Sequence, residues 1–144
     1  MTQNEKKDSI DIIVLTYQRK LFIKEFIEQL YLRTEYPFRL IVLDNGSTDG
    51  TIEWLKETKD KGLIWKLVFL NSIPMAMAFT KGMECVESEF FIVTQDDLIP
   101  PIVSPCWLTQ MVDAIEGNTD YATVNMRFKN RSWEKWVRKK NNKI

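Results

Sequence analysis

Two kinds of hydrophobic pattern alternate along the chain. Continuous apolar runs are typical of strands buried on both faces, whereas apolar residues that recur every three or four positions are typical of helices with one buried face. The runs predict strands at 10–16, 38–44, 63–70 and 90–95, and a weaker alternating pattern predicts a fifth at 121–128. The helical spacing predicts helices that contain 22–31, 50–59, 74–87 and 104–117.

Two of these helices have an apolar face that can be assigned residue by residue. The face of the first helix consists of residues four apart and their neighbours: Phe22, Phe26 and Leu30, with Ile23, Ile27 and Tyr31. The expected face of the third helix is Ala76, Phe79, Met83 and Val86.

Polar residues, proline and glycine mark the expected helix ends. The candidate caps of the second helix are Ser47, Thr48 and Asp49. Ser104 is expected to cap the fourth helix, with Pro105 in its first turn and Gly117 at its end.

Strands that alternate with helices predict parallel βαβ units, and therefore an α/β fold: an open, mostly parallel sheet with helices on both faces. We expect one such domain over residues 10–128, preceded by a polar lead at 1–9 and followed by a basic, tryptophan-containing tail or helix at 129–144. Sheets of this kind bind ligands beyond the carboxyl ends of their strands. The strand ends are therefore where function is expected.

Composition narrows the chemistry. The chain of 144 residues has no histidine, and its two cysteines, Cys85 and Cys106, have no metal-ligand spacing. A metal site must then use oxygen ligands, which favours magnesium, manganese or calcium. The N-terminus is polar and no apolar run approaches membrane-spanning length, so the cytoplasm is the expected location.

Three of the predicted strands end in polar sets: "TYQR" at 16–19, "DNGSTDG" at 44–50 and "QDDL" at 95–98. Parallel strands place these sets at the same edge of the sheet, where they should converge. The chain contains neither the glycine fingerprint of dinucleotide-binding folds nor a phosphate loop.

Asp96 and Asp97 are the sharpest feature of that edge. Two adjacent carboxylates at the end of a buried strand repel each other, and a divalent cation would compensate, with coordination sites left for phosphate oxygens. The plain alternative is a turn with two solvated acids.

The set at 44–50 also has two interpretations. A turn and a helix cap explain part of it but need only one acid and one glycine. Asp44 and Asn45 can in addition accept from and donate to a flat heterocycle or a ribose. Tyr17 can stack on a base, although a tyrosine after a strand more often serves packing.

Taken together, "IIVLTYQR", "LDNGSTDGT", "AFTKG" and "FFIVTQDD" resemble the N-terminal half of the inverting family-two glycosyltransferases, from about residue 10 to about residue 115. The resemblance implies the nucleotide-sugar-binding α/β fold called glycosyltransferase A. The order and spacing of four segments make it more specific than any one segment. It departs from the family at Asn45, where an aspartate is common.

The resemblance also implies roles for the strand-end residues. Thr16, Tyr17 and Arg19 would lie near the nucleotide, and Asp44 and Asn45 would recognise uracil and its neighbourhood. The acidic pair would form the DXD-like metal motif for magnesium or manganese: Asp97 as the more direct ligand, with Asp96 beside it.

The expected activity is transfer of a sugar, with inversion, from a nucleotide-diphospho-sugar, expected to be a UDP-sugar, to an acceptor hydroxyl. No catalytic base, acceptor or nucleic-acid partner is indicated. The alternative is a non-catalytic module that binds a nucleotide or sugar nucleotide, because family members usually continue into an acceptor-binding half. A purely structural α/β domain would leave the acids at the strand ends unexplained.

The C-terminal segment is strongly basic, since residues 127–144 hold eight Lys or Arg and one Glu. If it is helical, Trp133 and Trp136 lie among basic residues, an arrangement suited to an anionic membrane surface. Such contact would make the protein peripheral at the inner membrane surface. Packing of the two tryptophans on the protein itself is the favoured alternative.

Overall fold

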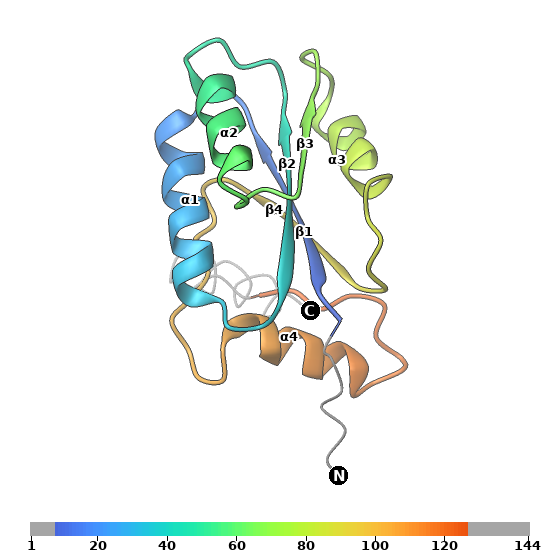
Figure 1. The fold of residues 1–144 in the computed structure, drawn as a ribbon. Helices are drawn as coiled ribbons and strands as arrows, with labels where there is room; N and C mark the ends of the chain where they lie inside the picture. The colour runs from blue at the N-terminus through green and yellow to red at the C-terminus, as the bar shows by residue number, and fades with distance from the viewer. Residues whose placement is uncertain (1–7, 127–144) are drawn as a thin grey trace, which may run out of the picture.

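The computed structural model describes residues 8–126, in which strands and helices alternate (Figure 1). Eight elements follow in chain order: β1 (Ile10–Thr16), α1 (Lys20–Arg33), β2 (Phe38–Asp44), α2 (Thr51–Asp60), β3 (Lys66–Phe69), α3 (Met75–Met83), β4 (Phe91–Gln95) and α4 (Trp107–Glu116).

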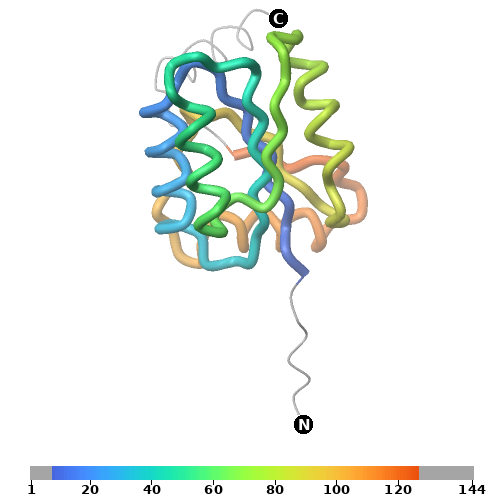
Figure 2. The backbone as a smooth tube through the Cα atoms, turned by 45° about the horizontal axis from the view of Figure 1, so that its top comes forward, coloured from blue at the N-terminus to red at the C-terminus, as the bar shows by residue number. Residues whose placement is uncertain are grey.

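The strands form one parallel sheet in the order β3-β2-β1-β4, which confirms the predicted α/β class. The register aligns Thr16 with Asp44, and Leu15 with Gln95, so three strands end at nearly the same level. This edge is at the top of Figure 1, and Figure 2 turns it toward the viewer.

Successive residues of β1 and β2 point to opposite faces of the sheet and pack against different helices. Ile12 and Val42 belong to the larger core, which also contains the buried residues of α1 and α4. Ile13 and Leu43 belong to a smaller core that includes Phe79 of α3. Accordingly, α1 and α2 lie on one face of the sheet and α3 on the other, as predicted (Figure 1).

Gly82 sets how closely α3 approaches the sheet. A Cβ atom at this position would lie 2.7 Å from Ile13 Cγ2 and 2.9 Å from Leu43 Cδ1, closer than side chains tolerate. A larger residue would push α3 outward, together with the loop that leads into it.

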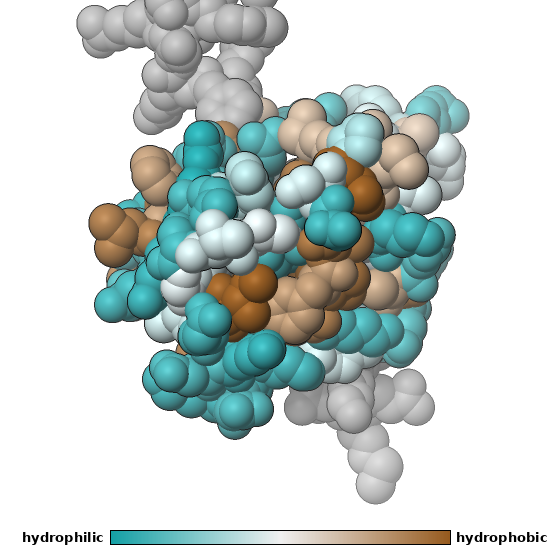
Figure 3. Space-filling view, turned by 90° about the horizontal axis from the view of Figure 1, so that it is seen from above, coloured by the Kyte–Doolittle hydropathy of each residue, from teal (hydrophilic) through white to brown (hydrophobic). Residues whose placement is uncertain are grey.

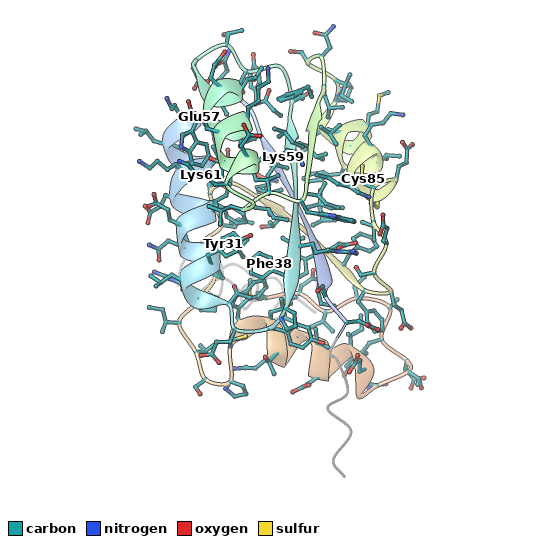
Figure 4. The ribbon with its side chains drawn as sticks, in the orientation of Figure 1. Tyr31, Phe38, Glu57, Lys59, Lys61 and Cys85 are labelled. Carbon is teal, nitrogen blue, oxygen red and sulfur yellow. The ribbon has the colours of Figure 1, made fainter. Side chains whose placement is uncertain are left out.

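The helix α1 buries two residues of each predicted apolar row and exposes the third. Ile23, Phe26, Ile27 and Leu30 are buried. The prediction was wrong for Phe22, which is 52% exposed. Tyr31 is 40% exposed and packs at the helix edge, where its ring centroid lies 4.9 Å from that of Phe38 (Figure 4).

The predicted face of α3 was also partly wrong. Ala78 and Gly82 are its buried residues, while Ala76 and Met83 are exposed. Of the predicted face, Phe79 and Val86 pack against the smaller core. The close approach of the helix at Gly82 turns the smallest residues toward the sheet.

Helix ends differ from the expected caps in two places. The N-cap residue of α2 is Gly50 rather than Ser47, Thr48 or Asp49, although Asp49 Oδ1 accepts a hydrogen bond from the backbone N–H of Thr51, the first residue of the helix, at 3.2 Å. Cys106, not Ser104, is the N-cap residue of α4, which begins at Trp107. Gly117 ends α4 as predicted.

The strand β4 is less covered than predicted. Its residues alternate between exposed and half-buried, and within residues 8–126 it pairs only with β1. The described part of the predicted fifth strand, 121–126, is not a strand. Without a neighbour on that side, β4 is an edge strand, and apolar residues such as Phe91 and Val93 are more than 40% exposed.

Within the described residues, no helix is long and apolar enough to cross a membrane. The basic tail and its two tryptophans lie outside the described residues, as does the polar lead through residue 7.

Candidate functional site

The polar ends of β1, β2 and β4 meet at the carboxyl edge of the sheet. Figure 3 looks down on this edge, where hydrophilic residues surround an apolar band. Hydrogen bonds connect the end of β1 to the segments that follow both of its neighbours: Thr16 Oγ1 donates to Asp96, and Thr16 O accepts from the backbone N–H of Asn45. The structure therefore confirms that the ends of β1, β2 and β4 converge at one edge of the sheet.

The end of β1 is tied to the acidic pair by a buried hydrogen bond. Thr16 Oγ1 donates to Asp96 Oδ2 at 2.8 Å. Thr16 is 1% exposed and Asp96 is 3% exposed. A carboxylate this deep is held in one orientation, so its second oxygen has a fixed direction.

Arg19 approaches that second oxygen. Its Nη1 lies 3.3 Å from Asp96 Oδ1 and 3.3 Å from Asp97 Oδ2. The Asp97 side chain is 41% exposed, in contrast to its neighbour. One cationic nitrogen is thus shared by one oxygen from each carboxylate.

The charges of this group shift its protonation. Burial raises the pKa of Asp96 above its ordinary value of 3.8, the hydrogen bonds from Thr16 and Arg19 oppose the rise, and the charge of Asp97 adds to it. The hydrogen bond to Asp96 raises the pKa of Arg19. The negative form of Asp96 is therefore disfavoured by burial and is stabilised by added positive charge.

A divalent cation fits the donor set of this pair. Two hard carboxylate oxygens converge on one position that already holds a cationic group. No cluster of three or more acidic or thiol ligands occurs among residues 8–126. Water and phosphate oxygens would have to complete the coordination, which is the usual way magnesium is bound with nucleotides.

The carboxylate of Asp44 shapes the loop that follows β2. Its Oδ1 accepts hydrogen bonds from the backbone N–H groups of Gly46 at 3.1 Å and Ser47 at 2.9 Å. Gly46 has a φ of +94°, and a Cβ atom there would meet Ser72 Oγ at 3.2 Å, so the turn requires glycine.

The other oxygen of Asp44 has no partner. Asp44 is 0% exposed, and its Oδ2 makes no hydrogen bond among the described residues. Buried acceptors are nearly always satisfied, so an orphaned oxygen at a strand end is a candidate for a ligand or water contact.

Asn45 uses its carboxamide to fix a different segment. Its Nδ2 donates to Ile73 O at 2.8 Å, and its Oδ1 accepts from Ile73 N at 3.0 Å. The side chain thus imitates a peptide group and holds the loop before α3. One N–H and one lone pair of the carboxamide remain for other contacts.

Gln18 joins the loops after β1 and β2, a role that the sequence analysis missed. Its Nε2 donates to Thr48 Oγ1 at 2.7 Å, and its Oε1 accepts from Thr48 N at 2.9 Å. Its backbone N–H donates to Ser47 Oγ at 2.9 Å. Gln18 has a φ of +53°, an unusual conformation that these three contacts maintain.

Tyr17 lies between these contacts and is 49% exposed. About half of its surface is therefore accessible to solvent at the end of β1. The structure brings together Thr16, Arg19, Asp96 and Asp97 by direct contacts, and Asp44 and Asn45 lie beside them at the end of the neighbouring strand.

Comparison with known proteins identifies the family. The model of "Glycosyl transferase family 2" matches residues 11–144. The chain belongs to this family. Membership agrees with the position of the polar residues at the carboxyl edge of the sheet.

Relatives and solved structures agree with this assignment. An uncharacterised glycosyltransferase from Haemophilus influenzae is 28% identical over 116 residues, which cover 76% of this chain and 33% of the relative. A mannosyltransferase from Pyrobaculum calidifontis, solved with GDP-Man and Mn²⁺, superposes with a TM-score of 0.59 at 26% identity, over 64% of this chain and 28% of that one.

A third similarity concerns the fold alone. TarS of S. aureus (residues 1–349) superposes with a TM-score of 0.64 at 21% identity, over 78% of this chain and 33% of that chain. In each comparison the chain spans about a third or less of the protein that it matches.

Proposed function

We propose that residues 10–126 bind the nucleoside diphosphate part of a sugar donor, with a UDP-sugar as the expected donor, for inverting transfer to an acceptor hydroxyl. The observation that carries this proposal is the shared position between Asp96 and Asp97. Two carboxylate oxygens there already face one cationic group at 3.3 Å each.

Asp97 and Asp96 would hold a magnesium or manganese ion. When bound, such an ion neutralises charge on the departing nucleoside diphosphate. Thr16 fixes the buried carboxylate through its hydroxyl, so Asp96 needs no rearrangement to present its Oδ1. The half-exposed Asp97 is free to adjust to the cation.

The end of β2 would recognise the base. The unpartnered Oδ2 of Asp44 has the right chemistry to accept from the imide N–H of uracil, and the loop after β2 would have to open around this buried oxygen to admit the base. Asn45 holds the loop on the far side of this position and keeps one donor and one acceptor in reserve. Tyr17, half exposed at the end of β1, offers a ring for stacking.

Calorimetric titration with UDP, GDP, ADP and CDP, each with and without Mn²⁺, tests the proposal. We expect one nucleoside diphosphate to bind, and only with the metal. Asp97→Asn should weaken this binding about tenfold or more, or at least ~1.4 kcal/mol, because one charged ligand is lost. Its thermal stability should match the wild type, since the side chain is 41% exposed.

Glu53→Gln is a matched control, because it neutralises an acid in the first turn of α2 without altering the acidic pair. The proposal fails if no nucleotide binds the folded protein. It also fails if Asp97→Asn and wild type bind equally well, or if removing Mn²⁺ has no effect.

A further inference from the structure

The Arg19 side chain occupies the position that a cation bound by the acidic pair would need. Its Nη1 is 3.3 Å from an oxygen of each carboxylate, whereas magnesium–oxygen distances are about 2.0–2.1 Å. A metal ion at that distance from both oxygens would lie within a few ångströms of the guanidinium, and the two cations would repel each other. Arg19 must therefore leave before Asp96 and Asp97 hold a metal.

We propose that Arg19 is a built-in counter-cation: it neutralises Asp96 and Asp97 while the site is empty, and exchanges its place for a divalent metal when the donor binds. This inference rests on the proposed function, because it assumes that the acidic pair is the metal site. It concerns a positioning residue, whose guanidinium would then pair with the diphosphate.

The need for a counter-cation follows from burial. Asp96 is 3% exposed and lies next to a second carboxylate. A buried negative charge without a partner is costly, and it either takes up a proton or attracts a positive group. Arg19 supplies that group from a neighbouring loop, so the empty site retains its shape.

The geometry of the contact between Arg19 and the two carboxylates is that of a weak ion pair. Charge-assisted N–H···O bonds are usually about 2.7–2.9 Å long, and arginine often grips a carboxylate with two nitrogens. Arg19 instead reaches two carboxylates with a single nitrogen at 3.3 Å, and its side chain is 47% exposed. Moving it costs no core packing.

The surroundings of Arg19 give the guanidinium a place to move. Arg19 precedes the first residue of α1, and its guanidinium carbon lies 5.1 Å from the centroid of the exposed Phe22 ring. This contact exists while the guanidinium pairs with the acids, and the exposed ring can keep it when the guanidinium moves away from them. From there a planar guanidinium is suited to two-point contact with phosphate oxygens.

Removing the guanidinium should have opposite effects on the two ligands. Without nucleotide, Arg19→Met should bind Mn²⁺ more tightly than wild type. If Arg19 blocks the position for about 90% of the time, the apparent affinity rises about tenfold. With Mn²⁺ saturating, the same variant should bind the nucleoside diphosphate more weakly, because the phosphate partner is lost.

The experiment is Mn²⁺ titration without nucleotide, read from the electron paramagnetic resonance of free Mn²⁺, followed by nucleotide titration in excess Mn²⁺. Lys24→Met is the control, since it removes one positive charge from the same helix away from the acids. Arg19→Lys serves as the second variant: a flexible ammonium should block less well and give a Mn²⁺ affinity between wild type and Arg19→Met. Thermal melting confirms that each variant is folded.

The outcomes separate this inference from the proposed function. If wild type binds Mn²⁺ and nucleotide but folded Arg19→Met binds Mn²⁺ no better than wild type or Lys24→Met, the counter-cation role is wrong and the donor site stands. If wild type binds neither ligand, the proposed function itself is wrong. Tighter metal binding together with weaker nucleotide binding supports the exchange.

Discussion

An arginine pairs with a buried aspartate at each end of β1, and the two pairs are built differently. At the amino end, Arg39 contacts Asp11 through Nε at 2.7 Å and Nη2 at 3.0 Å. At the carboxyl end, Arg19 shares one nitrogen between two carboxylates at 3.3 Å. We call the Arg39–Asp11 contact the saturated pair, because two guanidinium nitrogens bind both carboxylate oxygens. We call the contact of Arg19 with Asp96 and Asp97 the open pair, because a single nitrogen binds one oxygen of each carboxylate.

Asp11 and Arg39 have further partners around them. Asp11 also accepts from the backbone N–H groups of Glu87 at 2.7 Å and Ser88 at 3.0 Å. Arg39 stacks on Trp65, with its guanidinium carbon 3.8 Å from the ring centroid. Both oxygens of the first carboxylate have donors, and Oδ2 alone accepts three hydrogen bonds, so neither oxygen is left without a partner.

The pKa shifts of the two aspartates have opposite signs. Burial would raise the pKa of Asp11, but Arg39 and the two backbone N–H groups lower it below 3.8. Burial dominates at Asp96, whose pKa is raised. Asp11 therefore contributes stability above pH 3.8 that is lost as the pH falls through its lowered pKa. The contribution of Asp96 is present at low pH and is lost as the pH rises through its raised pKa.

Charge alone therefore does not distinguish the Arg39–Asp11 pair from the contact of Arg19 with the acidic pair. Both pairs join buried aspartates to arginines. The number of donors, the sharing of one nitrogen and the direction of the pKa shift distinguish them. A site that must accept a cation keeps its carboxylates under-satisfied, and a structural site does not.

Breaking the saturated pair should give the largest effect. Asp11→Ala leaves the Arg39 guanidinium and two backbone donors without their acceptor, and the loss of one partner of a buried pair costs about 3–5 kcal/mol. We expect the free energy of unfolding, measured by urea titration with tryptophan fluorescence, to fall by that amount. Asp97→Asn, at the open pair, should stay within about 0.5 kcal/mol of wild type. If Asp11→Ala and Asp97→Asn lower the free energy of unfolding by similar amounts, the two pairs do not differ in their contribution to stability.

The pH dependence of metal binding should sharpen the comparison at the open pair. Because the pKa of Asp96 is raised, Mn²⁺ affinity should begin to fall at a higher pH than an ordinary aspartate would cause. Below that pKa the affinity should fall about tenfold per pH unit, since one proton competes with the metal. Mn²⁺ titrations from pH 7 to pH 4 measure this.

Asp96→Asn is the control for the pH experiment. It should bind Mn²⁺ more weakly at pH 7 but lose less affinity on acidification, because the competing proton site is gone. An equally steep fall in this variant would assign the effect to another group.

The smallest expected effect concerns Gln18, an uncharged residue that joins the loop after β1 to the loop after β2 through Thr48. Gln18→Gly removes the two side-chain bonds to Thr48 but suits the φ of +53°. We expect stability within about 1 kcal/mol of wild type, because relief of the backbone offsets the lost bonds. Nucleotide affinity should fall about two- to tenfold, because a looser loop must be ordered on binding.

Ser72→Gly is the matched control, since Ser72 has a φ of +48° and does not join the two loops. It should gain similar backbone freedom while its nucleotide affinity changes less. If Gln18→Gly and wild type bind nucleotide equally, the contact to Thr48 does not position the site.

The strands at the centre of the sheet could be predicted from the sequence with correct bounds. Ile10–Thr16 and Phe38–Asp44 are apolar runs that end in a polar residue, and central strands are buried on both faces wherever the helices lie. The run that forms β4 looks the same but lies at the edge. Its exposure depends on which segments cover it, and the run itself carries no signal of that.

The strand-end residues of the candidate site could be predicted from the sequence, whereas the contacts between its loops could not. Strand ends in a parallel sheet meet at one edge, so Asp44 and Asp96 could be brought together without a structure. The contact of Gln18 with Thr48 could not, because it joins residues 30 apart through the geometry of two loops. Phe22 was misplaced because both rows of α1 are apolar along the whole helix, and only the packing against the sheet decides which members of each row are buried.

The loop after β2 has a consequence for the chemical ageing of the protein. An asparagine followed by glycine readily loses ammonia, because the glycine nitrogen attacks the carboxamide carbon and closes a succinimide ring. Here both reactants are restrained: Ile73 holds the Asn45 carboxamide, and Asp44 accepts the Gly46 N–H. The same contacts that shape the strand end therefore slow its conversion to aspartate, and any substitution that loosens them exposes Asn45 to deamidation during storage.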